Sequence, residues 1–378
     1  MKRNILVNKE KPIESTSMNI NHNLSKKSDI QIKRLNYIGS KFQLLDWLID
    51  NIKEQTGIAD LNNICIGDLF AGTGIVSYRF RKEGAIVIAN DAERYSACIA
   101  QAFNTGIYSD KLETAISTIN ILLENQNWEK ITPGYITKNY SPNEDCERMF
   151  FTPTNAKKID FVRKYLDTKL ANYSDDEFNF LLASLLVSAD SVSNVAAVYG
   201  CYLKKFKATA TKDLLLVPIH TDRRHVKSES KTTHMPVETF YNEQDTMLDI
   251  AYIDPPYNER QYSKNYFPLN QIAKSPIDLE KESSLTGKTG IPVDCYSSPF
   301  CRKRTALSAF EDLIKNIKSE YVFISYNTEG IVPKNDFIRM LEKYGVVNVL
   351  ERTYKRFKSY QYNGDKEIQE LLFCLHKT

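Results

Sequence analysis

The residues best placed to do chemistry are Asp254, Pro255, Pro256 and Tyr257, which directly follow an apolar run over residues 250–253. The run predicts a buried strand that ends at the prolines, because neither can donate a ladder hydrogen bond. Asp254 then lies at the carboxyl end of a strand, where open α/β sheets bind ligands. The stiff turn could hold a carboxylate, backbone carbonyls and an aromatic ring around a flat amino group. The alternative is an acidic strand end with an aromatic packing residue.

A second candidate site is a glycine-rich turn after another apolar strand. Its residues are Asp68, Phe70, Gly72 and Gly74. The pattern predicts a helix after the turn and a second strand over residues 85–89 that leads to Asp91. A βαβ unit with an acid about twenty positions after the glycines is the arrangement that holds an adenosyl ribose. Ser77 replaces the third glycine of a dinucleotide fingerprint, which favours another adenosyl compound over a nicotinamide cofactor.

Lys41 stands at the start of a further predicted helix. Ser40 and Gln43 form a capping-box pattern, and Gly57 is expected to end the helix. A cation in the first helical turn opposes the helix dipole, so we expect an anionic partner for Lys41 and the free backbone N–H groups. A solvated surface lysine is the alternative.

The composition is that of a globular protein with no apolar run long enough to span a bilayer. The net charge of +3 is small, so attraction to nucleic acid must come from local clusters. Scattered cysteines without a Cys-x-x-Cys pair favour free thiols in a reducing, cytoplasmic compartment and no structural metal site. Residues 1–30 lack an apolar core, so we expect a disordered tail and no signal peptide.

The pattern changes between residues 108 and 239. We expect a helix over residues 112–123, irregular chain over residues 133–142, and a buried helix capped by Ser174 and Glu177. Basic residues then alternate with aromatic ones, a combination suited to phosphates and unstacked bases. The basic candidates are Lys204, Lys205, Lys207, Arg223 and Arg224. A solvated loop is the alternative.

Helices and strands alternate again after the Pro-Pro turn. The expected elements are helices over residues 305–317 and 336–344, strands over residues 321–326 and 346–350, and two β-type runs around a turn at Asn363-Gly364. The Gly-Lys-Thr run at residues 287–289 follows no strand, which excludes a P-loop NTPase. The order of elements predicts one doubly wound α/β domain with a mainly helical insertion.

Taken in order, these motifs resemble the Dam-like, alpha-ordered DNA adenine-N(6) methyltransferases. The resemblance covers most of the chain after the tail and extends to residues 260–262 and 325–327. It implies a Rossmann-like, S-adenosylmethionine-dependent fold in three parts. These are a cofactor-binding part over residues 31–134, a target-recognition insertion over residues 135–238, and residues 239–378 with the Asp-Pro-Pro-Tyr motif and the C-terminal strands.

The resemblance implies S-adenosylmethionine as the cofactor. Tyr37 and Lys41 would bind its methionine carboxylate, Asp91 its ribose hydroxyls, and Asp245 would flank its adenine. The full implied set is Tyr37, Lys41, Asp68, Phe70, Gly72, Gly74, Asp91, Asp245 and Asp254.

The implied reaction is methylation of the exocyclic amine of an adenine flipped out of double-stranded DNA. Asp254 and the Pro255 carbonyl would accept the two amine hydrogens, and Tyr257 would stack on the base. Alignment and electrostatics would supply most of the rate enhancement. The insertion would read bases in the major groove while its basic residues neutralise phosphates. The resemblance also implies a restriction-modification system, with a cognate restriction endonuclease acting on the same site.

Three alternatives stay open. Cytosine-N(4) enzymes more often carry Ser at the position of Asp254, and RNA adenine enzymes usually lack so large an insertion. An inactive DNA-binding subunit could keep the same fold, but intact Asp254, Tyr257, Lys41 and Asp91 argue against it.

Overall fold

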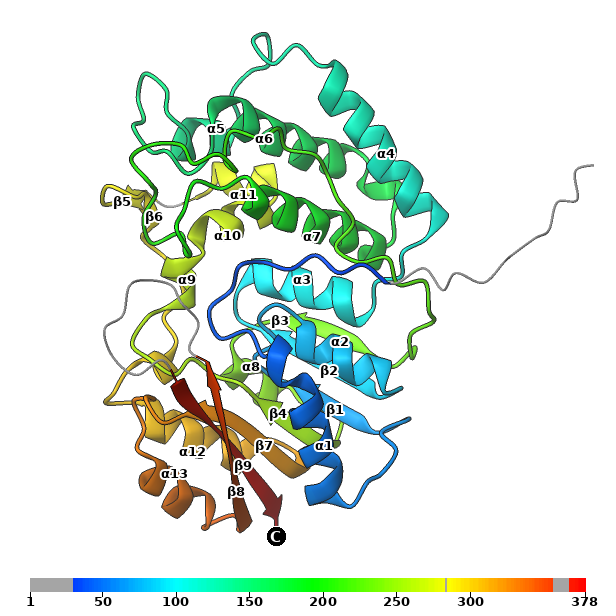
Figure 1. Cartoon of the computed structure of the whole chain (residues 1–378), viewed down its shortest axis with the longest axis vertical. Helices are drawn as coiled ribbons and strands as arrows, with labels where there is room; N and C mark the ends of the chain where they lie inside the picture. The colour runs from blue at the N-terminus through cyan, green and yellow to red at the C-terminus, as the bar shows by residue number, and fades with distance from the viewer. Residues whose placement is uncertain (1–29, 283, 356–366) are drawn as a thin grey trace, which may run out of the picture. The chain divides into compact units, whose positions relative to one another are not determined.

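A seven-stranded sheet in the order β3-β2-β1-β4-β7-β9-β8 is the element around which the chain folds (Figure 1). The computed structural model describes residues 30–282, 284–355 and 367–378. Nearly all of the predicted disordered tail and the predicted turn at Asn363-Gly364 lie outside these residues.

Every strand of the sheet except β9 runs in the same direction. The strands are β1 (Cys65–Asp68), β2 (Ile86–Asp91), β3 (Lys231–His234), β4 (Leu248–Ile253), β7 (Ser319–Asn327), β8 (Gly345–Lys355) and β9 (Glu367–Lys377). β1 lies between β2 and β4, so the residues that end these three strands meet at one edge of the sheet. The amino end of β9 reaches the same edge because β9 is antiparallel to its neighbours.

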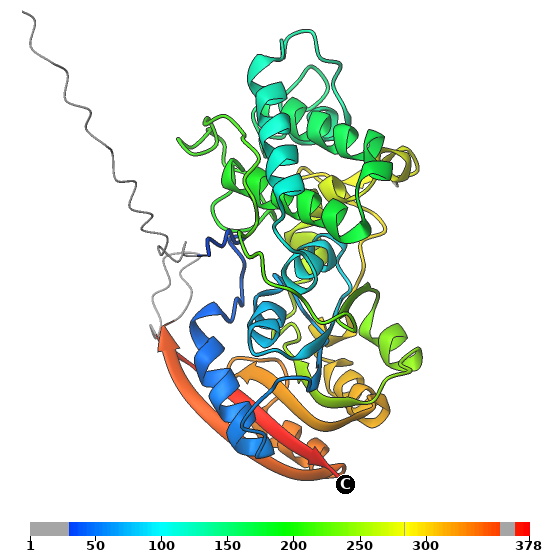
Figure 2. The same cartoon turned by 90° about the vertical axis from the view of Figure 1, so that its right-hand side faces the viewer.

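Helices cover both faces of the sheet, which confirms the predicted doubly wound α/β fold (Figures 1 and 2). One face packs against α1 (Leu45–Thr56), α2 (Ile75–Lys82) and α3 (Arg94–Asn104), and the other against α8 (Val237–Asn242), α12 (Ala306–Asn316) and α13 (Lys334–Leu341). Successive β4 residues alternate between the two cores, with Ile250 and Tyr252 in the first and Ala251 and Ile253 in the second. An apolar strand buried on both faces is typical of a parallel sheet.

A helical region packs beyond α3 and is built from two separate segments of chain. The first contains α4 (Asp110–Asn125), α5 (Tyr135–Tyr140), α6 (Pro153–Thr168) and α7 (Asp175–Ser191). The second contains α9 (Tyr262–Asn265), α10 (Phe267–Ala273), α11 (Pro276–Glu280) and the hairpin β5 (Leu285–Thr286) and β6 (Ile291–Pro292). The hydroxyl of Tyr140 donates to the Gly290 carbonyl (3.0 Å) and joins the segments. This second segment was not predicted.

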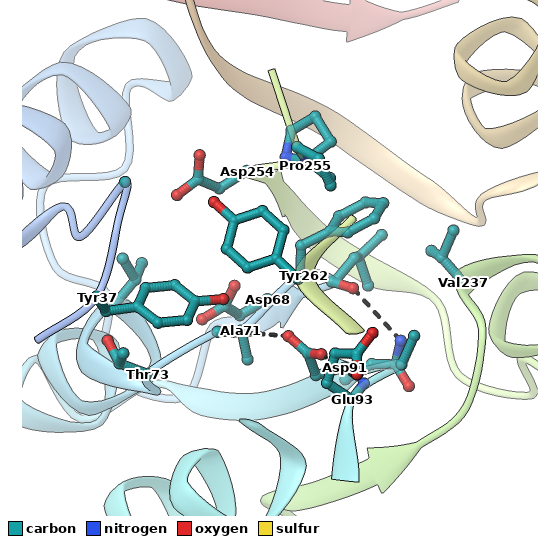
Figure 3. A pocket seen from close by; sticks show the side chains of 18 of the residues that line it. Tyr37, Asp68, Ala71, Thr73, Asp91, Glu93, Val237, Asp254, Pro255 and Tyr262 are labelled. Atoms are coloured by element: carbon teal, nitrogen blue, oxygen red, sulfur yellow. Dashed lines mark hydrogen bonds between the residues drawn. The ribbon is translucent and has the colours of Figure 1, made fainter. Parts of the chain in front are cut away.

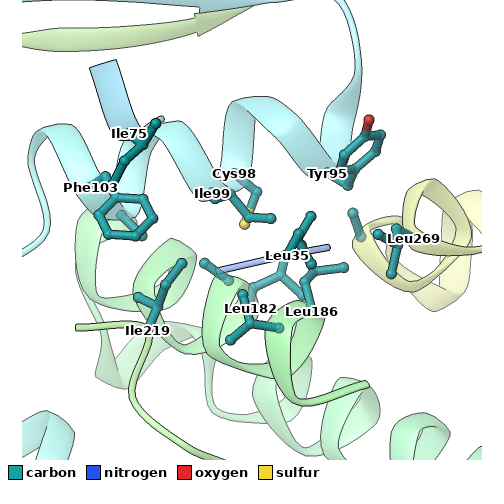
Figure 4. Packing of buried hydrophobic residues seen from close by; sticks show 14 of the residues in the cluster. Leu35, Ile75, Tyr95, Cys98, Ile99, Phe103, Leu182, Leu186, Ile219 and Leu269 are labelled. Carbon is teal, nitrogen blue, oxygen red and sulfur yellow. The ribbon is translucent and has the colours of Figure 1, made fainter. Parts of the chain in front are cut away.

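The helical region shares one hydrophobic core with the sheet. Leu182 and Leu186 of α7 lie against Cys98 and Ile99 of α3, with Leu35 beside them (Figure 4). All five side chains are buried, so the two parts pack as one body along this seam.

Several local predictions are confirmed. Ser174 and Glu177 form the capping box of α7, Gly57 ends α1 in the left-handed conformation (φ +73°), and the seven cysteines are free. The predicted helices over residues 112–123 and 305–317 are α4 and α12. The Gly-Lys-Thr run directly follows the two-residue strand β5, contrary to the prediction that no strand precedes it, but it leads into β6 and not into a helix. No helix among the described residues is long and apolar enough to cross a membrane.

Other local predictions are wrong. The capping box at Ser40 and Gln43 does not form, because a 3₁₀ turn over Phe42–Leu44 precedes α1. The polar strand β3, which falls inside the predicted insertion, pairs with β2 in the main sheet. Residues 135–140, expected to be irregular, form α5.

The unpredicted helix α5 begins on a carboxylate that lies far along the chain. Asp160 of α6 accepts hydrogen bonds from the Ile136 N–H (2.9 Å), the Thr137 N–H (2.9 Å) and the Thr137 hydroxyl (2.6 Å). Asp160 therefore replaces the cap that the sequence before α5 lacks.

We expect Asp160→Ala to lower the free energy of unfolding by about 2–4 kcal/mol, because it leaves buried donors at the start of α5 without an acceptor. Chemical denaturation would measure the change. Asp145→Ala, at an exposed position in the turn after α5, is the matched control and should change stability by less than about 0.5 kcal/mol. Equal stabilities of the two variants would contradict the capping role.

Candidate active site

A pocket opens at the edge where β1, β2 and β4 end (Figure 3). It is lined by most of the predicted site residues, namely Tyr37, Lys41, Asp68, Phe70, Gly72, Asp91, Asp254, Pro255, Pro256 and Tyr257. The register Asp68↔Tyr252 aligns the ends of β1 and β4, so the glycine-rich turn and the Pro-Pro turn face each other. The structure therefore brings the separate motifs of the sequence into one site.

Asp254 is bound by an ammonium and a phenol inside the pocket. The Nζ of Lys41 lies 2.8 Å from Asp254 Oδ1, and the Tyr257 hydroxyl donates to the same oxygen. Lys41 is only 3% exposed and also contacts the Tyr257 hydroxyl. The anionic partner expected for Lys41 thus lies within the chain, and Lys41 precedes the 3₁₀ turn instead of lying in a helical turn.

Asp91 holds the glycine-rich turn in place. The Gly72 N–H and the Glu93 N–H donate to its two carboxylate oxygens, each at 2.8 Å. Burial raises the pKa of Asp91 to about 6, although these hydrogen bonds oppose the increase. Gly72 has φ +54°, and a Cβ there would lie 3.3 Å from the Tyr37 ring. A glycine is therefore required where the turn approaches Tyr37.

Tyr37 is fixed by the helix that follows the Pro-Pro turn. Its ring lies 5.3 Å from the Tyr262 ring and 5.0 Å from the Tyr266 ring. The hydroxyl of Tyr262 donates to the Ile38 carbonyl (3.2 Å), and the Ile38 N–H donates to the Tyr266 hydroxyl (3.0 Å). These contacts join the start of the described chain to the segment after the Pro-Pro turn.

Asp68 presents an unsatisfied carboxylate oxygen at the pocket. The residue is 1% exposed, and its Oδ2 accepts a hydrogen bond from the Ser77 hydroxyl (2.6 Å). Its buried Oδ1 has no hydrogen-bond partner within the described part of the chain. Burial raises the pKa of Asp68 to about 7, with a smaller contribution from Asp254 and Asp91, while Ser77 opposes the increase. A buried acceptor without a donor fits the ammonium group of S-adenosylmethionine.

Glu93 and Val237 line the pocket at the end away from Tyr37 and were not predicted (Figure 3). Glu93 accepts a hydrogen bond from the Asn270 amide (2.6 Å), and burial raises its pKa to about 8. Its position two residues after Asp91 was a signal that could have been used. Val237 follows β3, a strand too short and polar to be recognised from its sequence.

Tyr296 and Ser298 also line the pocket, from the loop after β6. The Ser263 hydroxyl donates to the Tyr296 carbonyl (2.6 Å). Gln261 both accepts from the Ser298 N–H (2.8 Å) and donates to the Ser298 carbonyl (3.1 Å). The loop is thus held by residues 33–37 positions earlier, and no local sequence pattern marks it.

Two predicted cofactor residues lie outside the pocket lining. Asp245 is exposed and precedes β4, whereas Asp254 follows that strand, so the strand separates the two by roughly 20 Å. The role given to Asp245 is therefore corrected. Gly74 (φ +69°) packs on α3 instead, because a Cβ there would lie 2.6 Å from the Ala100 Cα.

None of the five predicted DNA-binding residues is among the residues that line the pocket. Lys204 and Lys205 are exposed on a loop that is tied to α9 by the Tyr199 N–H and the Asn265 carbonyl (2.8 Å). Lys207 donates to the Val195 carbonyl (2.7 Å). This loop therefore meets the segment that follows the Pro-Pro turn.

The other two predicted DNA-binding residues pair with acids. Arg223 contacts Asp110 (2.5 Å) and Glu113 (2.7 Å), and Arg224 contacts Asp222 (2.5 Å). Both arginines precede β3 and so lie toward the amino ends of the strands, whereas the pocket lies at their carboxyl ends. DNA contact by these residues stays a prediction.

Residues 37–338 match the model of the D12 class N6 adenine-specific DNA methyltransferase family. The type II methyltransferase M.CviAII of Paramecium bursaria Chlorella virus 1 is 39% identical over 91% of this chain and 99% of its own. M.NlaIII of Neisseria lactamica is 36% identical over 86% of this chain and 93% of its own. M.FokI of Planomicrobium okeanokoites is 32% identical over 91% of this chain but only 53% of its own.

We expect the affinity for S-adenosylmethionine to fall as the pH decreases through 7 toward 6, because protonated Asp68 and Asp91 no longer attract the cationic cofactor. The dissociation constant should be about tenfold higher at pH 6 than at pH 8. Titration calorimetry would measure it.

Asp68→Asn should weaken binding at pH 8 and flatten the pH dependence. Asp50→Asn, at an exposed position on α1, is the control and should leave both unchanged. An affinity for the wild-type protein that is constant between pH 6 and pH 8 would contradict the role of Asp68.

Proposed function

The chain belongs to the D12 class N6 adenine-specific DNA methyltransferases, and we propose which role in the reaction each residue of its pocket has. The enzyme transfers a methyl group from S-adenosylmethionine to the N6 amine of adenine in DNA. The observation that carries the assignment of roles is that the unpartnered oxygen of Asp68 and the carboxylate of Asp254 belong to one pocket. A site for the cationic donor and a site for the target amine are thus adjacent.

The cofactor is proposed to bind along the glycine-rich turn. Asp68 would accept hydrogen bonds from its ammonium group and Asp91 from its ribose hydroxyls, while Phe70 and Val237 would contact its adenine. Tyr37 and Gly72 would line the methionine portion, with Lys41 near its carboxylate. The bound cofactor supplies an electrophilic methyl group on a sulfonium. The chain's residues hold that methyl group in line with the target amine.

The target amine is proposed to bind between Asp254 and the Pro255 carbonyl. Lys41 and Tyr257 already contact Oδ1 of Asp254, so Oδ2 would accept one amine hydrogen and the carbonyl the other. These bonds would draw the amine lone pair out of conjugation with the ring and toward the methyl group. Pro256 stiffens the turn, and Tyr257 would stack on the flipped base.

The helical region is proposed to recognise the target sequence. We assign it residues from α4 to the loop before β3, together with the segment from α9 to β6, in place of residues 135–238. Lys204, Lys205 and Lys207 lie on the loop that meets α9 and are proposed as the main phosphate contacts. Arg223 and Arg224, which pair with acids, would contribute less.

A place in a restriction-modification system is also proposed. Relatives that cover nearly the whole chain are type II methyltransferases, which supports a modification enzyme with a fixed recognition site and a cognate endonuclease in the cytoplasm. The family description favours adenine over cytosine and DNA over RNA. The intact ion pair of Lys41 and Asp254 argues against an inactive DNA-binding subunit.

Transfer of labelled methyl from S-adenosylmethionine to unmethylated duplex DNA, with the modified nucleoside identified after digestion, tests this function. We expect N6-methyladenine. Asp254→Ala should reduce the rate at least about a thousandfold, because it removes an acceptor used in the transition state, while cofactor affinity changes less than about threefold. Loss of both together would mean that Asp254 is chiefly a cofactor residue. Label on cytosine, or on RNA alone, would contradict the proposed function.

The DNA contacts are tested by the salt dependence of duplex binding. Replacing Lys204 and Lys205 by Ala should reduce the slope of log K against log salt concentration by about 2, since each phosphate contact contributes about 0.9. Arg223→Ala with Arg224→Ala is the matched pair and should reduce it by less than about 1. An equal reduction for both pairs would place DNA on the amino-end side of the sheet as well.

A further inference from the structure

Glu370 is a fully buried acid at the edge of the sheet where the pocket opens. Neither the motifs nor the proposed reaction assigns it a role. It lies near the amino end of β9, opposite Asn327 of β7 and Arg352 of β8. Its exposed fraction is 0%. An acid is rarely fully buried unless it is paired, so its presence calls for a reason.

The side chain of Glu370 contacts the residues that hold Asp254. Its Oε1 lies 3.3 Å from Lys41 Nζ and accepts a hydrogen bond from the Tyr257 hydroxyl (3.3 Å). Its Oε2 is buried and has no hydrogen-bond partner within the described residues. Lys41 therefore stands between two carboxylates, at 2.8 Å from Asp254 and 3.3 Å from Glu370.

Lys41 carries a single positive charge, which the buried carboxylate of Glu370 and the partly buried carboxylate of Asp254 share. The more strongly Glu370 attracts the ammonium of Lys41, the less that ammonium neutralises the negative charge of Asp254. Asp254 then becomes a stronger acceptor for the target amine. Removing the charge of Glu370 would let Asp254 attract Lys41 without competition from that carboxylate. The acceptor strength of Asp254 is thus set partly by a residue that does not reach the pocket lining.

We propose that Glu370 is a positioning residue for methyl transfer, which in its ionised form divides Lys41 and the Tyr257 hydroxyl between itself and Asp254. The inference rests on the proposed role of Asp254 as the acceptor for the target amine. Glu370 touches neither substrate nor cofactor and acts through Lys41 and Tyr257.

The ionisation of Glu370 depends on all the groups that face it. Burial raises its pKa to about 7, Asp254 adds to the increase, and the contacts with Lys41 and Tyr257 oppose it. Arg352, across from it on β8, has its guanidinium carbon 5.9 Å from the centre of the Trp47 ring. Among the residues that the structure describes, the titratable and charged groups that face Glu370 are Lys41, Tyr252, Asp254, Tyr257 and Arg352. The rate of methyl transfer should therefore rise with pH through about 7 as Glu370 ionises.

The test is the single-turnover rate of methyl transfer between pH 6 and pH 8. Cofactor and DNA are saturating, so that their binding does not affect the measured rate. For wild type we expect a rate about tenfold lower at pH 6 than at pH 8. Glu370→Gln, which keeps the shape but not the charge, should be about tenfold slower than wild type at pH 8 and nearly independent of pH. Glu351→Gln is the matched control, since Glu351 lies on the neighbouring strand β8 and pairs with Lys334 at the surface.

A second variant separates positioning from a structural role. Glu370→Asp keeps a carboxylate but withdraws it from Lys41, so it should lower the rate while retaining the pH dependence. If Glu370→Gln fails to fold, Glu370→Asp still tests the inference. Thermal unfolding and the dissociation constant for S-adenosylmethionine would reveal such a failure. A pH dependence lost in Glu370→Asp would overturn the inference.

The outcomes distinguish this inference from the proposed function. If wild type transfers no methyl group to DNA adenine, the proposed function fails. If wild type is active but Glu370→Gln has the same rate and pH profile, only the role of Glu370 fails. The same conclusion follows if Glu370→Gln slows a Lys41→Gln variant as much as it slows wild type, because Glu370 would then not act through Lys41.

Discussion

The pairing of β1 between β2 and β4 is the constraint on which the site depends. This register brings the ends of three strands together and thereby places Asp68, Asp91 and Asp254 around one pocket. Carboxylates so close and so poorly hydrated repel each other, and each is stable only because a donor approaches it. Ser77, the Gly72 N–H and Lys41 are those donors. The turns around the pocket are thus shaped by the need to satisfy its acids.

The helical region and the site are mechanically connected. Tyr262 and Tyr266 hold residues 37–38 against the glycine-rich turn, and the same short helix contacts the loop that carries Lys204. A movement of the helical region on DNA would therefore reach the cofactor side of the pocket through packed side chains. Because α7 and α3 share a core, such a movement must be small or must shift both elements together.

The sequence was informative where a local pattern decides the structure. Apolar runs ended by prolines or glycines located β4 and β1, and the capping box located α7. The sequence was uninformative where a residue far along the chain determines the local structure. The start of α5 depends on Asp160, and Glu370 contacts Tyr257 across 113 positions. The error at Asp245 has a different origin, because that role came from the family resemblance although the sequence itself places Asp245 before the strand that leads to Asp254.

Lys41 and Glu370 lie near opposite ends of the described chain, and their contact has a consequence for folding kinetics. The contact between Lys41 and Glu370 can form only when β9 has paired with β7 in the sheet. Pairing between segments far apart along the chain is intrinsically slow. The glycine-rich turn and Asp91 depend instead on β1, β2 and β4, none of which pairs with β8 or β9. The cofactor-binding turn and the surroundings of the acceptor carboxylate are therefore built by different parts of the sheet, and only the latter require contacts across nearly the whole described chain.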